Sequence, residues 1–138
     1  AYFERIAEAY VAEVLPLEAF FRDDCPIVDS IAELLGEAAR TYTTCSDQAG
    51  CLILEALRAD RSGEGRRIAM RVAQIRREKL QAFIARGAPA VALIATDVVT
   101  VTMAGMSAAA RDGVSCVCLE QVAAVATVGL RSLIEGSA

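Results

Sequence analysis

The chain has 138 residues, of which 55% are apolar and 5% aromatic, and its formal net charge is −4. One domain is expected at this length, because a chain of this size buries about 68% of its unfolded surface when it folds. The sequence contains no histidine, which excludes mechanisms built on an imidazole base or an imidazole metal ligand. The acidic balance also predicts that these residues alone bind nucleic acid poorly.

The N-terminal part of the chain is predicted to form three helices. Apolar residues recur at helical spacing over 2–15, and Pro16 ends that pattern. A short apolar piece follows at 17–21, after which a second helix is predicted over 26–42, with a proline suited to its first turn. Hydroxyl and carboxylate side chains then supply caps for a third helix, over about 48–59.

Three longer helices are predicted for the rest of the chain. Gly63 precedes a fourth helix that runs to Arg86, and a Gly-Ala-Pro sequence then ends it and begins a fifth helix over 89–111. Gly113 closes the fifth helix, and a serine caps the sixth, over 115–135. The basic outer face of the fourth helix is interpreted as a solvated, ion-paired surface and not as a nucleic-acid patch. The residues of this helix predicted to face inward are Ile68, Val72, Ile75, Leu80 and Phe83.

The two closing helices are unusually poor in charge. Residues 88–134 carry only five charged side chains, so both helices are apolar or small over most of their circumference. A helix on the outside of a monomer needs only one apolar stripe. Two such helices in succession need a second surface to pack against, and the simplest one is another copy of the chain. The β-branched run at 98–102 has no turn signals around it, so it is interpreted as buried helix and no strand is predicted.

A membrane-spanning interpretation of the segment 87–110 is disfavoured. Its only charged residue, Asp97, lies near the centre, where a charge costs a few kcal/mol in a bilayer. No signal peptide is visible, so the five cysteines are expected to be reduced thiols in a cytoplasm. Their spacing fits no common zinc pattern, and no metal site is predicted.

Three passages together resemble the C-terminal regulatory domain of the TetR family of transcriptional repressors. The Gly-Cys-Leu-Ile-Leu-Glu-Ala sequence at 50–56 resembles a frequent helix start in that family, and 66–87 resembles its long central helix. The segment 90–134 resembles its closing helix pair, which forms a four-helix bundle in the dimer. The resemblance spans essentially the whole chain. It implies an all-α, six-helix domain over 1–138 that binds an effector and dimerises, with 89–135 supplying the dimer helices.

The chain departs from this family in one respect. Family members begin with a three-helix DNA reader that contains a helix-turn-helix, and no such module is seen here. Residues 1–15 would be the helix that connects the reader to the regulatory domain. The resemblance therefore implies a cytoplasmic homodimer, with DNA bound only through a domain not present in this sequence. It implies no enzymatic activity and no cofactor.

The resemblance also implies a site for a small, largely apolar effector among the first, second, fourth and fifth helices. Apolar walls with a few hydroxyl groups suit such a ligand, and methionines adapt to varied shapes. For each residue, ordinary core packing is the alternative. Asp97 is expected to meet a cationic ligand, to pair with Arg131, or to lie exposed. Hydroxyl groups for orienting a ligand are expected from Tyr10, Tyr42, Thr96, Thr100 and Ser107. The residues predicted to line the site are Tyr10, Phe21, Leu35, Tyr42, Cys51, Leu54, Ile75, Met103 and Met106.

The dimer surface is predicted from stripes of apolar and small residues, which allow helices to approach closely. The stripe on the fifth helix is Ile94, Val98, Val101, Gly105 and Ala108. The sixth helix carries one stripe of Val122, Val125, Gly129 and Ser132. It carries another of Leu119, Ala123, Ala126, Leu130 and Leu133. One stripe must face the core of its own subunit and the other the partner, and the sequence leaves open which.

Two other functions remain open from the sequence. Cys116 and Cys118 lie in the first turn of the sixth helix, where the helix dipole favours a thiolate, as in a redox switch. Buried, unreactive thiols are the competing interpretation. The chain is also compatible with a dimerisation module that binds no small molecule.

Overall fold

The computed structural model describes residues 5, 16–44, 50–59 and 63–137, and within these ranges all regular structure is helical. The all-α prediction is therefore confirmed. The predicted helix at 2–15 lies outside the described residues apart from Arg5. The elements are η1 (Leu17–Phe20), α2 (Ile27–Thr43), α3 (Leu52–Ala59), α4 (Glu64–Ala85), η3 (Pro89–Val91), α5 (Ala92–Arg111) and α6 (Cys116–Glu135).

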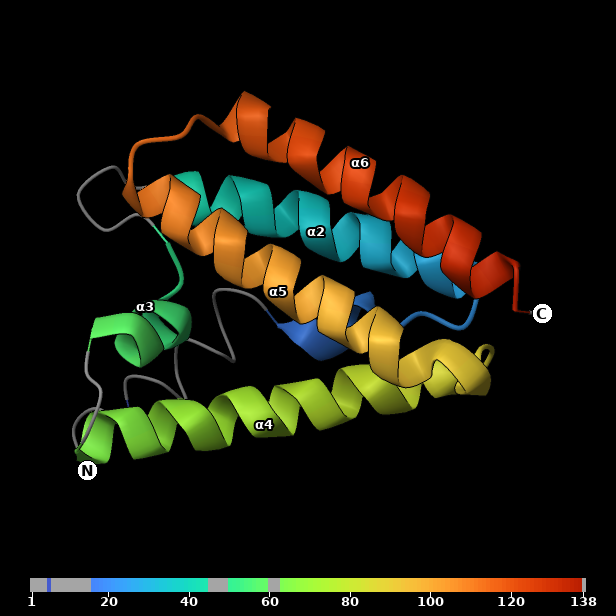
Figure 1. The fold of residues 1–138 in the computed structure, drawn as a ribbon, viewed down its shortest axis with the longest axis horizontal. Helices are drawn as coiled ribbons and strands as arrows, with labels where there is room; N and C mark the ends of the chain where they lie inside the picture. The colour runs from blue at the N-terminus through green and yellow to red at the C-terminus, as the bar shows by residue number, and fades with distance from the viewer. Residues whose placement is uncertain (1–4, 6–15, 45–49, 60–62, 138) are drawn as a thin grey trace.

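Helix α5 is the centre of the molecule. It contacts α2, α3, α4 and α6, whereas α6 packs mainly on α2 and α3 packs mainly on α4 (Figure 1). This position explains why α5 is so poor in charge, because most directions around it lead to another helix. The β-branched run at 98–102 is helical, as predicted, and the fully buried Thr96 hydroxyl donates to the Ala92 carbonyl at 2.7 Å.

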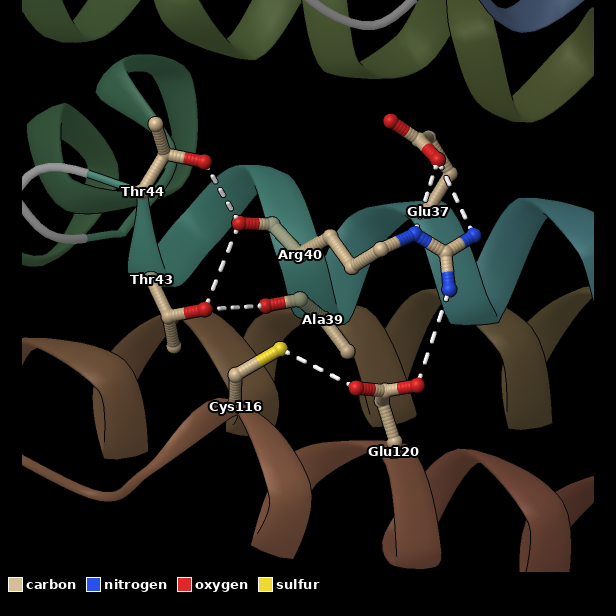
Figure 2. Close-up of polar contacts among 7 residues, drawn as sticks. All are labelled: Glu37, Ala39, Arg40, Thr43, Thr44, Cys116 and Glu120. Atoms are coloured by element: carbon tan, nitrogen blue, oxygen red, sulfur yellow. Dashed lines mark hydrogen bonds and ion pairs between the residues drawn. The ribbon is translucent and has the colours of Figure 1, made fainter.

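Helix α2 forms where the sequence predicts it. Pro26 precedes its first turn with an extended ψ of 144°, and the buried residues recur at helical spacing along one face. At the other end, Thr43 and Thr44 donate hydrogen bonds to the carbonyls of Ala39 and Arg40 (Figure 2). The Arg40 carbonyl is one of the last four of the helix, where acceptors lack helical backbone partners.

Helix α3 begins later than predicted, at Leu52 instead of residue 48. Gly50 lies outside the helix with a φ of +95°, and its N–H donates to the Tyr42 carbonyl at 2.8 Å. A Cβ at this position would lie 3.0 Å from the Ser107 carbonyl oxygen, so both the conformation and the space require glycine. Gly50 and Cys51 thus form a turn that holds the start of α3 close to Ser107 of α5.

Helix α4 matches its predicted bounds to within a residue or two, but one inward position is wrong. Ile68, Leu80 and Phe83 are buried, whereas Ile75 is 45% exposed. At about 100° of rotation per residue, Ile75 lies within about 20° of the buried Ile68 around the helix, so helical spacing alone could not distinguish the exposed position from the buried one. Its apolar character is therefore not a sign of core packing.

Helix α6 begins as predicted, with the Ser115 hydroxyl accepting from the Cys118 N–H at 3.2 Å. The structure also decides which stripe of α6 faces the core of its own subunit. Leu119, Ala123 and Leu130 are buried, and Ala126 and Leu133 pack partly against the same core. The stripe that contains Val122 and Val125 points outward.

Candidate functional site

A cavity of about 350 Å³ lies between α3, α4 and α5. Leu17 of η1 and Tyr42 of α2 complete its wall, and its volume falls at the lower end of the range of about 300–1,000 Å³ for ligand pockets. Apolar side chains make up most of the lining. They are Leu17, Tyr42, Cys51, Ile53, Leu54, Leu57, Met70, Ala73, Leu80 and Met103, joined by the polar residues Gln74, Arg76, Arg77 and Thr100.

Four of the residues predicted to line an effector site come together at this cavity. Tyr42, Cys51, Leu54 and Met103 lie on three different helices or helix starts, and all contribute to its wall. Tyr10 falls outside the described residues. The cavity therefore combines residues that are distant in sequence, which is a usual property of a small-molecule site.

The other predicted lining residues lie elsewhere. Phe21 stacks on Phe83, with ring centroids 4.5 Å apart, and Leu35 is fully buried in the core. Ile75 is exposed on α4, and the buried Met106 borders the groove between α5 and α6.

Sequence reasoning placed the fourth helix at the site but chose Ile75 on it, and it missed the residues of α4 that line the cavity. Met70, Ala73, Arg77 and Leu80 recur at intervals of three or four residues and line one face. That spacing is the signal that would have identified them. It was obscured because the face mixes an alanine and an arginine with two large apolar residues.

The polar edge of the cavity is an ion pair between α4 and α5. The Arg77 guanidinium lies 2.5 Å from the Asp97 carboxylate and donates to the Thr100 hydroxyl at 3.4 Å. Of the three alternatives expected for Asp97, the pairing with Arg131 does not occur, because α5 presents Asp97 toward α4, where its side chain is 46% exposed.

Arg131 instead bridges α6 to α2. It donates to Asp29 at 2.8 Å and to Glu135 at 2.9 Å. The hydrogen bond that Arg131 donates to Asp29, followed by the one that it donates to Glu135, raises the pKa of Arg131 above its usual value. This contact is exposed, so it orients α6 on α2 more than it stabilises the fold.

One buried hydrogen bond fixes the cavity wall at α3. The Ser107 hydroxyl accepts from the Cys51 N–H at 2.7 Å and lies 3.3 Å from a Glu55 carboxylate oxygen, to which it donates. Cys51 lines the cavity, so this bond ties the wall to α5.

Ser107→Ala is expected to lower the free energy of unfolding by about 1–3 kcal/mol, because it leaves the buried Cys51 N–H without its acceptor. Urea unfolding at a fixed protein concentration measures this loss. Ser137→Ala, at an exposed serine that donates only to the Ile134 carbonyl, serves as the control. Equal midpoints for the two variants would contradict the assignment.

A broad apolar surface lies on the outward side of α5 and α6. Ile94, Val101, Val122 and Val125 are exposed there, and a Cβ added to Gly105 or Gly129 would meet no atom within 4 Å. Val98 is half-buried against the core. An open groove of about 650 Å³ runs between the two helices in this region. Val117 and Val128, which were not predicted, extend the exposed apolar surface of α6.

The described cysteines, Cys25, Cys51, Cys116 and Cys118, are all free thiols. Figure 2 shows the setting of Cys116, whose thiol donates to Glu120 at 3.2 Å. Arg40 of α2 lies 3.6 Å from the other Glu120 oxygen and also pairs with Glu37. The sulfur thus faces a carboxylate directly.

No group of three metal-binding side chains occurs among the residues that the structure describes. The segments Pro89–Arg111 and Cys116–Glu135 are long and apolar enough to cross a membrane by length and composition alone. The first of them is the central packing helix of this fold, and core helices of soluble proteins pass the same test.

No family model and no solved structure matches the chain. The sequence is 34% identical to the HTH-type transcriptional repressor BdcR of Escherichia coli (strain K12), over 134 residues that make up 96% of this chain and 68% of the relative. This similarity identifies the chain as part of a transcriptional regulator, and it confirms the regulatory role expected from the sequence. The chain belongs to the family of HTH-type transcriptional repressors that includes BdcR.

Proposed function

We propose that this chain is the effector-binding and dimerisation domain of a TetR-like transcriptional repressor. It binds a small, largely apolar molecule in the cavity between α3, α4 and α5, and it forms a cytoplasmic homodimer through α5 and α6. Binding changes the DNA affinity of an N-terminal reader. The observation that carries the proposal is the cavity itself, a largely apolar space of about 350 Å³ inside a regulator of the BdcR family.

The position of the cavity suggests how occupancy reaches the reader. Leu17 belongs to the cavity wall, and only Pro16 separates it from the segment 1–15, which we expect to connect the reader to this domain. A ligand that prefers one placement of this segment shifts the population of the two states. A coupling of about 1–3 kcal/mol between ligand and DNA is sufficient for regulation.

The proposed dimer places the outward stripes of α5 and α6 against the same stripes of a second subunit. Exposed glycines and valines along both helices permit close helix packing. A twofold arrangement is self-complementary, so one surface of each chain is sufficient. The four helices then form a bundle that covers the apolar surface of both subunits.

Filling the cavity tests the effector site. A panel of small apolar molecules is screened by thermal melting, and a true ligand at about a hundredfold excess over its Kd raises Tm by about 5–10 °C. Ala73→Phe places a phenyl group in the cavity and is expected to abolish that shift. Ala82→Phe, at an exposed alanine of the same helix, is expected to retain it.

Melting without ligand establishes that both variants fold. A shift that survives in Ala73→Phe would place the ligand outside the cavity. The absence of any shift across the whole panel would favour a dimerisation module that binds no small molecule.

A further inference from the structure

The polar residues of the cavity are gathered on one side. Gln74, Arg76 and Arg77 come from α4 and Thr100 from the facing turn of α5, whereas α3 contributes only apolar side chains and Cys51 precedes it. An apolar molecule needs none of these groups. A one-sided polar edge suits a ligand with an apolar body and a single polar end.

We infer that the effector is an amphipathic carboxylate whose head group binds Arg77 and whose apolar tail fills the cavity. The inference rests on the proposed function, since it names the ligand class of the same site.

Arg77 is already engaged by a carboxylate, that of Asp97, at 2.5 Å. A guanidinium presents a planar fork of donors that matches a carboxylate in geometry and charge. The Arg77 side chain is only 28% exposed, whereas Asp97 is 46% exposed. The arginine is thus held partly out of water at the cavity edge, while its present partner can return to solvent at little cost. A ligand carboxylate is the chemical equivalent of that partner.

The apolar part of the ligand would lie against Leu54, Leu57 and Met103. Methionine adapts its shape to a flexible chain, and Met70 offers a second such side chain at the cavity. A volume of about 350 Å³ suits a medium-length alkyl chain or a small substituted aryl group.

Binding of this kind would exchange one ion pair for another. The ligand would take Arg77 from Asp97 and so release a direct link between α4 and α5. Asp97 would then compete with the ligand for Arg77 and would add unfavourable charge near an anionic head group. Removing the Asp97 charge is therefore expected to strengthen the binding of carboxylates, which a purely structural ion pair would not do.

The test compares decanoate with 1-decanol, which share a chain and differ in the head group. Titration calorimetry on the full chain is expected to give a Kd for decanoate that is about tenfold weaker in Arg77→Met, consistent with loss of a charge-assisted hydrogen bond. Asp97→Asn is expected to bind decanoate more tightly than the unsubstituted chain. The Kd for 1-decanol is expected to change little in either variant. Arg67→Met, at an exposed arginine of α4 that does not line the cavity, is the control.

Melting without ligand checks that Arg77→Met folds. If that variant does not fold, the affinity of Asp97→Asn for decanoate still tests the inference. Equal affinity for decanoate in all variants, or binding of 1-decanol alone, would overturn the inference and leave the apolar effector site intact. If neither decanoate nor 1-decanol binds, and no molecule of the apolar panel raises the Tm, the proposed effector site is contradicted as well.

Discussion

Val125→Glu is expected to convert the proposed homodimer into a monomer. Val125 is 74% exposed at the groove between α5 and α6, close to Val101, which is 71% exposed. A twofold interface buries the substituted residue in both subunits, so two carboxylates lose their water at once. If each costs about 2 kcal/mol, the Kd of the dimer rises about a thousandfold. Sedimentation velocity at micromolar concentration measures the change in mass.

Ile75→Glu makes the same substitution at an exposed apolar residue of α4, away from the α5–α6 surface. It is expected to leave the sedimentation coefficient of the dimer unchanged. A parent chain that already sediments as a monomer would contradict the proposed dimer. A Val125→Glu variant that remains dimeric would show that the subunits meet through another surface.

The helices of this fold could be predicted because each carries its own local signals. Pro26 before α2, Gly63 before α4 and Ser115 before α6 all mark helix starts as expected. The start of α3 could not be placed in this way. The turn at Gly50 depends on Ser107 in α5, a contact across more than fifty residues that no local pattern encodes.

The candidate site could be predicted only in part, because it depends on how helices rotate against one another. Periodicity indicates that α6 has two apolar stripes, but only its packing on α2 decides which of them is buried. The ion-pair partner of Asp97 is likewise determined by how two helices pack. Arg77 lies twenty residues earlier in the chain, and it reaches Asp97 because α4 and α5 pack side by side (Figure 1).

Leu35→Ala is expected to lower the free energy of unfolding by about 2–5 kcal/mol, the usual cost of truncating a buried leucine. Leu35 is 0% exposed on α2, and it is absent from the cavity wall although the sequence predicted it there. The substitution removes packing that the surrounding helices cannot fully replace. Urea unfolding at one fixed protein concentration measures the loss, since a dimer makes apparent stability depend on concentration.

Leu54→Ala is the matched comparison, because Leu54 is half-buried and does line the cavity. Its loss of stability is expected to be smaller, since the side chain already borders empty space and leaves fewer contacts behind. Its effect on ligand affinity is expected to be larger than that of Leu35→Ala. If instead Leu35→Ala keeps its stability and loses ligand affinity, the prediction is contradicted. Leu35 would then line the effector site, which would lie deeper in the fold, against α2.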